Sequence, residues 1–331
     1  MQGIRVAMLG LAALVAAAAD NLPQRGAQPV PVLEVKKLAR QFVDLWDASK
    51  DLPSEQRVAR FKTDIAVRFP EFYGVERYAG AVTEAEQDKR IANAIEKFGP
   101  LREAYLAKLT QFDQDLPRHI ASFTAAFPDY RPSGETWLLH SLGEMDGGTR
   151  EFKGKQYLIF GVDGMVRYHG TSNEAAFFHH ELFHTYHQKS FGDCAQSGVW
   201  EPLWIEGLAV HVSKVLNPDA SLKEMLLDMP EGLVARTDEK LAASFAQLES
   251  ILASTDVKYA APLFQFGKDD TGLIPRRGYY LGYLVARELG KTRDIQALGK
   301  LSCEEARPLV FATVHQLRLE AEQRQAAGKA Q

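Results

Sequence analysis

Apolar residues in the first part of the chain recur at the spacing of an α-helix. They return every three or four positions at Val35, Leu38, Phe42 and Leu45, and again within residues 91–109. Because this spacing places them on one helical face, we expect residues 32–125 to be helical throughout. Prolines begin or interrupt helices, and four of them are expected to separate these helices: Pro53, Pro70, Pro100 and Pro117.

The pattern changes after residue 131. Residues 137–140 (Trp-Leu-Leu-His) and 156–160 (Gln-Tyr-Leu-Ile-Phe) favour strands, and the Gly-rich, charged residues 143–154 separate them. They predict a small sheet. Helical spacing then returns and predicts helices at residues 175–188, around 206, and at 224–227, 241–252 and 282–289. We therefore expect an α+β protein that is predominantly helical, with the sheet before the helix at 175–188 and a helical C-terminal part.

The helix predicted at residues 175–188 contains the sequence His-Glu-x-x-His. Residues four apart lie on the same face of an α-helix, so the imidazoles of His180 and His184 can bind one metal ion. Glu181 lies beside the first ligand, and its carboxylate can reach a metal-bound water without taking a ligand position. The motif therefore predicts most of a catalytic zinc site.

Local signals set the expected limits of this helix. Thr171 and Glu174 have the spacing of a capping box, which places the N-cap at Thr171. Gly192 supplies a stop signal at the other end.

Two histidines leave a zinc site one protein ligand short. The metzincin pattern would continue with Gly and His where this chain has His187 and Ser190, so that pattern is excluded. A downstream carboxylate is the alternative, and Glu206 lies 22 residues after His184. Such a gap fits a loop and a second helix packed across the first. The predicted ligands of one Zn²⁺ ion are thus His180, His184 and Glu206, with one position open to water.

Together these two segments resemble the gluzincin branch of zinc metallopeptidases, in the peptidase MA-like superfamily. The likeness lies in His180-Glu181-x-x-His184 and in residues 204–209 (Trp-x-Glu-Gly-x-Ala), within a stretch of about residues 155–290. It implies the same three zinc ligands, with Glu181 as the general base. Residues 278–283 (Gly-Tyr-Tyr-Leu-Gly-Tyr) also resemble a segment of a family of predicted zinc-dependent proteases in that superfamily.

The chain departs from the gluzincin pattern in one place. Many gluzincins have an acidic residue four positions after the third ligand, where it supports a zinc-bound His. Here that position is Val210, followed by His211. The resemblance also implies that residues 160–164 (Phe-Gly-Val-Asp-Gly) form a strand edge that pairs with extended substrate.

A hydrogen-bond donor to the developing oxyanion would complete a hydrolytic site. Tyr279 is the leading candidate, since a phenol near the zinc can donate to that oxygen. A buried structural tyrosine is the competing interpretation of the same residue. The alternative donors are four histidines: His140, His169, His187 and His211.

The function predicted is the zinc-dependent hydrolysis of a peptide bond in a peptide or protein substrate. Glu181 would take a proton from the attacking water and deliver it to the leaving amine. Two alternatives stay open: a zinc-stabilised binding protein without activity, and a zinc hydrolase of a non-peptide amide. Glu181 favours a hydrolase, because a purely structural zinc site needs no base beside its ligands.

The first 19 residues have the features of a secretory signal peptide. Arg5 precedes the apolar residues 6–19, which end in small residues. This apolar run is shorter than the roughly 20 residues that a membrane-spanning helix needs. An uncleaved N-terminal anchor is the alternative. We expect a secreted or periplasmic protein with no membrane span after signal removal. The predicted regions are a signal peptide (1–19), an N-terminal helical region (20–131), a zinc metallopeptidase-like catalytic domain (132–315) and a polar, frayed tail (316–331).

Composition fits an ordinary globular enzyme, with 46% hydrophobic and 25% charged residues and a net charge of −4. This charge gives no support to nucleic-acid binding, and the sequence does not specify an oligomeric state.

Two cysteines occur, Cys194 and Cys303. They can form one disulfide in an oxidising compartment or remain two unpaired thiols. Cys194 as a fourth zinc ligand would close the site to water.

Overall fold

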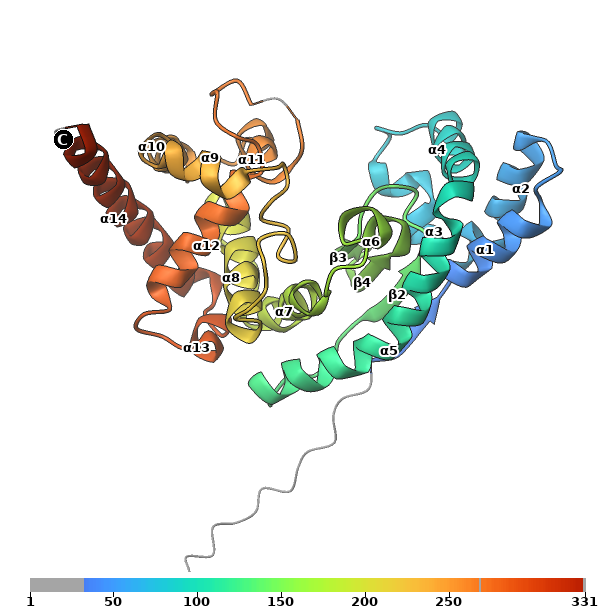
Figure 1. The fold of residues 1–331 in the computed structure, drawn as a ribbon, viewed down its shortest axis with the longest axis horizontal. Helices are drawn as coiled ribbons and strands as arrows, with labels where there is room; N and C mark the ends of the chain where they lie inside the picture. The colour runs from blue at the N-terminus through green and yellow to red at the C-terminus, as the bar shows by residue number, and fades with distance from the viewer. Residues whose placement is uncertain (1–32, 268, 330–331) are drawn as a thin grey trace, which may run out of the picture. The chain divides into compact units, whose positions relative to one another are not determined.

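The computed structural model describes residues 33–267 and 269–329 of the chain. Within these ranges helices predominate and a small sheet precedes the helix that carries His-Glu-x-x-His (Figure 1), so the predicted α+β, mainly helical class is confirmed. The predicted signal peptide lies outside the described residues. No helix in the described part of the chain has the length and apolar character that crossing a membrane requires.

The strands are β1 (Val35–Lys37), β2 (Glu135–Leu139), β3 (Gly147–Phe152) and β4 (Lys155–Gly161). The helices before the sheet are α1 (Ala39–Ala48), α2 (Ser54–Asp64), α3 (Pro70–Tyr73), α4 (Glu84–Lys97) and α5 (Arg102–Ala126), with short 3₁₀ turns η1 (Ala66–Arg68), η2 (Val75–Tyr78) and η3 (Gly99–Leu101). Those after it are α6 (Val162–Tyr168), α7 (Ala175–Phe191), α8 (Trp200–Leu216), α9 (Leu233–Glu239), α10 (Leu241–Ile251), α11 (Val257–Phe264), α12 (Arg277–Leu289), α13 (Ile295–Gly299) and α14 (Cys303–Lys329).

The sheet has the strand order β1-β2-β4-β3. Strands β1, β2 and β4 are parallel, and β3 pairs antiparallel with β4 at the edge. The expectation of helix from residue 32 onward was wrong at its start, because residues 35–37 pair with β2 as a strand, with Val35 opposite Thr136. The helical spacing holds from Leu38, and α1 buries Phe42 and Leu45.

The strand edge was predicted at the wrong residues. Residues 160–161 end β4, which lies between β2 and β3, and α6 begins at Val162. The edge strand is instead β3, within the stretch that the sequence suggested was only a separator. Its glycines and charges have low strand propensity, but pairing with β4 along six residues overrides that preference.

Three of the four prolines lie at the predicted kind of boundary. Pro53 is the N-cap of α2, Pro70 begins α3 and Pro100 lies in η3. The expectation for Pro117 was wrong, because it lies inside the 25-residue helix α5. This helix buries a row of apolar side chains on both sides of the proline, among them Phe112 and Ile120, and that packing outweighs one missing backbone hydrogen bond.

Helix α5 joins the N-terminal helices to the centre of the molecule by packing against α6 and α7. The Phe112 ring lies 5.3 Å from that of Phe160 in β4 and 5.6 Å from that of Phe178 in α7. The aromatic residues Phe69, Phe72 and Tyr73 are buried in the core.

The C-terminal helices pack around α8 and α12. Residues 241–252 and 282–289 are helical almost throughout, as expected, but 224–227 form turns and no helix. Residues 316–329, expected to fray, continue α14 and bury Leu317 and Ala321. Cys194 and Cys303 form a disulfide, which settles the question left open by the sequence and ties the connection between α7 and α8 to the start of α14.

Candidate metal centre

Helix α7 holds the two histidines of the motif. It ends at Phe191, and Gly192 follows with φ 66° and ψ −165°, a positive-φ conformation that glycine adopts far more readily than other residues. The capping box predicted at Thr171 does not form, because the helix begins at Ala175. The Glu174 carboxylate accepts a bond from Lys108 in the core at 2.9 Å instead of reaching back to the chain, and both side chains are fully buried.

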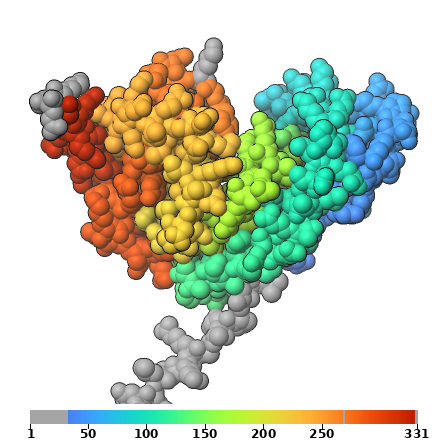
Figure 2. All heavy atoms as spheres, in the orientation of Figure 1, coloured from blue at the N-terminus to red at the C-terminus, as the bar shows by residue number. Residues whose placement is uncertain are grey.

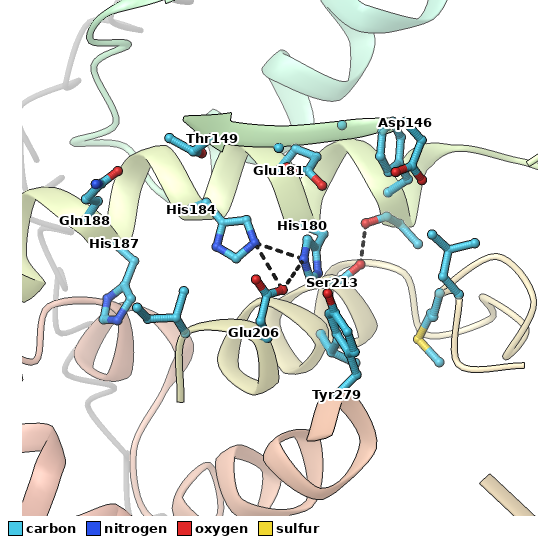
Figure 3. Close-up of a pocket in the computed structure, with 18 of the residues that line it drawn as sticks. Asp146, Thr149, His180, Glu181, His184, His187, Gln188, Glu206, Ser213 and Tyr279 are labelled. Atoms are coloured by element: carbon cyan, nitrogen blue, oxygen red, sulfur yellow. Dashed lines mark hydrogen bonds and ion pairs between the residues drawn. The ribbon is translucent and has the colours of Figure 1, made fainter. Parts of the chain in front are cut away.

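Helix α8 supplies the third residue and packs directly against α7. Its first turns are held by Trp200 and Trp204, both completely buried. Glu206 therefore projects from a fixed helix toward the paired histidines, as Figure 3 shows.

The donor atoms of His180, His184 and Glu206 converge on one point. The Nε2 atoms of the two histidines lie 2.9 Å apart, and Glu206 Oε2 lies 3.2 Å from His180 Nε2 and 3.5 Å from His184 Nε2. Tetrahedral ligands with bonds of about 2.0–2.1 Å lie roughly 3.3 Å from one another. These three residues are thus a group that could hold a metal ion, and the spacing is that of a tetrahedral site.

The charges of the group support each other. Burial would raise the pKa of Glu206, but the two imidazoles bring it well below its usual range. Burial lowers the pKa of His184, and the Glu206 carboxylate outweighs burial so that the pKa is raised. An anionic carboxylate between two imidazoles is a donor set suited to a divalent cation.

Glu181 lies beside this group. Its side chain is buried, and its Oε2 atom has no hydrogen-bond partner among the described residues. Burial raises the pKa of its carboxyl, while the charges of His180 and His184 act in the opposite direction. A buried, unpartnered carboxylate oxygen is costly, and its position beside the metal group is the one expected of a proton acceptor.

Two glycines explain why residues 204–209 on α8 and residues 278–283 on α12 lie side by side. A Cβ atom on Gly207 would lie 2.1 Å from the Gly282 carbonyl carbon, and one on Gly282 would lie 2.3 Å from the Leu203 carbonyl oxygen. Helices α8 and α12 therefore touch backbone to backbone. This contact brings Tyr279, one turn before Gly282, close to Glu206 on α8.

The phenol of Tyr279 points toward the His180–Glu206 pair in Figure 3. Burial raises its pKa far above the ordinary value, and the charge of Glu206 acts in the same direction. The phenol is therefore protonated and able to donate. Its ring is braced by Phe264 at 5.7 Å, edge to face.

The metal group and Tyr279 open into a cavity of about 430 Å³, walled by β3, α7, α8, residues 224–226 and the start of α12. Figure 2 shows the surface hollowed between the yellow and the green parts of the chain. The edge strand β3 runs along this cavity. Gly147 is required there, because a Cβ atom would lie 2.6 Å from the Phe177 ring and 3.1 Å from the Glu181 carboxyl carbon.

The outer edge of β3 offers backbone groups to the cavity. Gly161 N donates to Asp146 O at 2.8 Å, so these two residues form a hydrogen-bonded pair. Such pairs alternate in an antiparallel ladder, which directs the backbone N–H and C=O of Gly147 and Thr149 away from β4. Thr149 O accepts a bond from Arg150 at 3.0 Å on that side.

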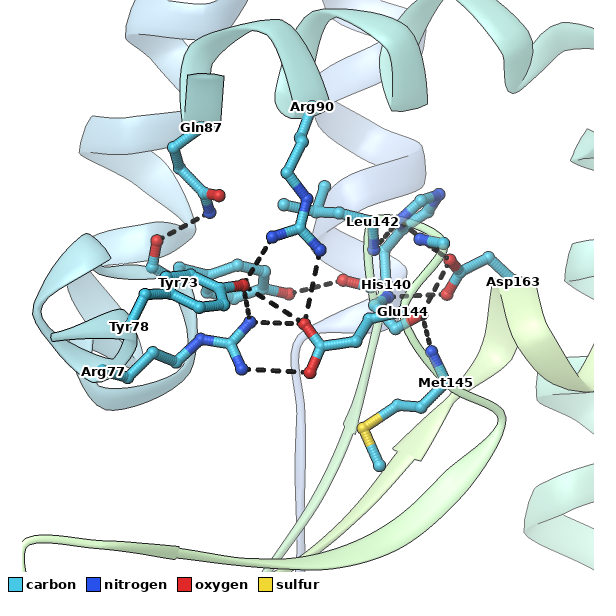
Figure 4. Close-up of polar contacts among 12 residues, drawn as sticks. Tyr73, Arg77, Tyr78, Gln87, Arg90, His140, Leu142, Glu144, Met145 and Asp163 are labelled. Atoms are coloured by element: carbon cyan, nitrogen blue, oxygen red, sulfur yellow. Dashed lines mark hydrogen bonds and ion pairs between the residues drawn. The ribbon is translucent and has the colours of Figure 1, made fainter. Parts of the chain in front are cut away.

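The loop that leads into β3 is fixed from two directions, as Figure 4 shows. Asp163 in α6 accepts bonds from the backbone N–H groups of Ser141 at 2.6 Å and Gly143 at 2.7 Å. On the other side, Glu144 forms an ion pair with Arg77. The N-terminal helices thus help to position the strand that borders the cavity.

The alternative oxyanion donors lie elsewhere, with one exception. His140 accepts from the Leu142 backbone in the core, His169 contacts Asp146 through Nε2 at 2.9 Å, and His211 is buried against α12. None of these three lines the cavity. His187 does, but its Nδ1 atom donates to Gly299 O at 2.9 Å.

Three buried histidines give the fold a predicted dependence on pH. Burial lowers the pKa of His179, His187 and His211 to about 4. In the unfolded chain each histidine has a pKa near 6.5. Each therefore contributes about 3 kcal/mol to the free energy of unfolding above that pH, and this contribution is lost as the pH falls to 4. We expect the free energy of unfolding of the chelator-treated protein in urea to fall over this window.

The control for this prediction is His211→Phe, which removes one of the three titrating groups. The loss of stability between pH 7 and pH 4.5 should then be smaller than in the unaltered protein. Identical losses in the two proteins would contradict the assignment of a buried neutral imidazole to His211.

Comparison with protein-family models, curated proteins and solved structures found no match to this chain. The resemblance to gluzincins therefore stays a prediction from the motif residues, and a function has to be argued from the geometry of the site.

Proposed function

We propose that this chain is a zinc-dependent hydrolase that cleaves peptide bonds. The observation that carries the proposal is the convergence of two imidazole nitrogens and one carboxylate oxygen beside the buried, unpartnered Oε2 of Glu181. A site with only a structural role needs no such carboxylate, because its own ligands satisfy the metal.

Zinc is the ion that this donor set fits. Two neutral imidazoles and one carboxylate are the protein ligands of several catalytic zinc sites, and hard oxygen-binding ions such as magnesium prefer sites without imidazole. When bound, zinc supplies Lewis acidity, which polarises a carbonyl and makes a water more acidic.

The chain's own residues then have distinct roles. Glu181 accepts the proton of the attacking water at a carboxylate oxygen and passes it to the nitrogen of the leaving amine. The hydroxyl of Tyr279 donates a hydrogen bond to the oxygen that gains negative charge as the carbonyl is attacked. Glu181 is buried, and Tyr279 is half-buried with its ring against Phe264, so neither has to be ordered during the reaction.

An extended peptide is the substrate that the cavity suits. The outward backbone groups of Gly147 and Thr149 can pair with a peptide backbone of any sequence, as an added strand does. This pairing would lay the peptide between β3 and the metal group, with the bond to be cleaved above Glu181.

The disulfide between Cys194 and Cys303 supports a secreted or periplasmic location, because such bonds persist in oxidising compartments. The predicted signal peptide points to the same location.

The test of this proposal is Glu181→Gln. We expect the variant to bind one zinc per chain, as the unaltered protein does, while turnover of a broad peptide library falls by about 10²–10⁴-fold. Glu201→Gln is the matched control, because Glu201 lines the same cavity on α8 but contributes no atom to the metal group. Undiminished turnover in Glu181→Gln would reject the mechanism, and no turnover by the zinc-loaded parent would favour a binding protein or a hydrolase of non-peptide amides.

A second substitution tests the role of Tyr279. Tyr279→Phe removes only the phenolic hydroxyl, so we expect kcat to fall by about 10²-fold with little change in KM or in thermal stability. Tyr283→Phe, one turn further along α12 and outside the cavity, should leave kcat unchanged. Equal kinetics for the two variants would assign Tyr279 a purely structural role.

A further inference from the structure

Arg276 stands at the boundary of α12, one turn before Tyr279, and lines the cavity. Its backbone adopts φ 63° and ψ 6°, the left-handed conformation that residues other than glycine rarely take. The backbone N–H is held by Pro262 O at 2.9 Å. Such strain persists only where the surroundings enforce it, and it is concentrated at ligand-binding positions.

The Arg276 side chain is fixed as firmly as its backbone. The guanidinium carbon lies 4.6 Å from the centre of the Phe266 ring and 4.9 Å from that of Tyr279, and Nη1 donates to Met229 O at 3.0 Å. A guanidinium has five N–H donors; one of them is used on Met229 O and another on the Tyr279 hydroxyl, so donors remain for a ligand. Within the described residues no carboxylate lies at ion-pair distance from it.

The neighbouring residue shows the contrast. Arg277 is buried, forms an ion pair with Asp269, and donates to Gln247 Oε1 and to Ile274 O, each at 3.0 Å. The charge of Arg277 is thus neutralised inside the protein. Arg276 lines the cavity and, among the described residues, forms no ion pair with a carboxylate.

Outside the metal group, no acidic side chain that lines the cavity forms an ion pair with Arg276 in the described part of the chain. Glu181 Oε2 has no hydrogen-bond partner there. Asp146 contacts His169, Glu224 accepts from Ser221, and Asp193 and Glu201 lie where α7 ends and α8 begins. A guanidinium held in place, with donors left over, is suited to a planar carboxylate, which it binds through two parallel hydrogen bonds.

We propose that Arg276 is a specificity residue that binds a carboxylate of the substrate, either an acidic side chain near the cleaved bond or the peptide's C-terminus. This inference rests on the proposed function, since it concerns the peptide held in the same cavity. The substrate class is peptides with a carboxylate close to the scissile bond. Neither the metal group nor the backbone of the strand edge would select this class.

The test compares matched peptides. One pair differs only by Glu against Gln near the cleaved bond, and a second pair by a free against an amidated C-terminus. For the zinc-loaded protein we expect kcat/KM to favour the carboxylate member of at least one pair by about 10-fold or more. In Arg276→Gln this ratio should fall to about one. Arg287→Gln is the control, because Arg287 also lies over a tyrosine ring on α12, at 5.5 Å from Tyr283, but outside the cavity; it should keep the ratio.

Binding provides a readout that does not need turnover. The same peptide pairs are titrated into Glu181→Gln and into Glu181→Gln combined with Arg276→Gln, and the ratio of Kd values should again depend on Arg276. The proposal is overturned if the two peptides of each pair bind Glu181→Gln equally well. It is also overturned if the preference for the carboxylate peptide persists after Arg276→Gln is added. A lower rate for every peptide at a constant ratio also overturns it, because it shows that Arg276 only supports Tyr279. If the carboxylate peptides bind preferentially, this preference depends on Arg276, and no peptide is cleaved, Arg276 is supported as the carboxylate site and the peptidase assignment is rejected.

Discussion

Replacing Glu206 with alanine is expected to weaken zinc binding by about 10²-fold or more and to abolish turnover at zinc concentrations that saturate the unaltered protein. The reason is geometric. Glu206 supplies one of three donor atoms that lie within 4.8 Å of one another, and its carboxylate is the one anionic group among them. Two imidazoles alone leave a zinc site half coordinated. Competition with a coloured chelator measures the affinity directly.

Glu201→Ala provides the comparison. Glu201 lies on the same helix and lines the same cavity, yet its carboxylate accepts a bond from Ser197 at 2.7 Å and does not face the histidines. It should retain zinc with unchanged affinity. If Glu206→Ala bound zinc as tightly as Glu201→Ala, the third ligand would have to be another residue.

Gly282→Ala is expected to cost about 2–3 kcal/mol of stability and to reduce both zinc affinity and turnover. The added methyl group would lie 2.3 Å from the Leu203 carbonyl oxygen and 2.9 Å from the Gly207 Cα atom, so α8 and α12 must move apart. Glu206 precedes Gly207 directly, and Tyr279 lies one turn before Gly282. Separation of the helices therefore displaces both from the histidines on α7. Urea unfolding and chelator competition on the same samples measure the two effects.

Gly328→Ala serves as the control for glycine replacement in a helix. Gly328 lies in α14, where an added Cβ would meet nothing within 4 Å, so the substitution should be neutral or slightly stabilising. A Gly282→Ala protein with unaltered stability and zinc affinity would show that the close approach of α8 and α12 does not position the site.

The part of the site that could be predicted from sequence is the part set by one helix. His180, Glu181 and His184 lie within five residues of one another, so the period of the α-helix alone determines how they face. Glu206 could be proposed because a carboxylate of suitable spacing follows in the next apolar segment. The structure brings these residues together as expected.

The walls of the cavity could not be predicted in the same way, because they depend on contacts between distant segments. The edge strand β3 contains two glycines and several charges, and only its pairing with β4 makes it a strand. Neither Gly207 nor Gly282 indicates its partner when it is considered alone. The position of Tyr279 follows from their contact, 75 residues apart in sequence, and no local signal specifies it.

Local signals also failed where tertiary packing is stronger. Pro117 and the capping sequence at Thr171 are ordinary helix boundaries in isolation. In the folded chain, packing of the apolar face of α5 keeps the helix continuous through Pro117. Lys108 forms an ion pair with the Glu174 carboxylate, which the capping box would need. Residues 316–329 are polar on average, but they remain helical because a few apolar side chains pack against the core.

The most direct test of the central claim is anomalous diffraction at the zinc absorption edge from crystals grown with one equivalent of zinc. A single strong peak is expected at about 2.0–2.2 Å from the Nε2 atoms of His180 and His184 and from a carboxylate oxygen of Glu206, with Glu181 outside the coordination shell. A peak elsewhere, or a Glu206 carboxylate turned away from the bound ion, would contradict the account.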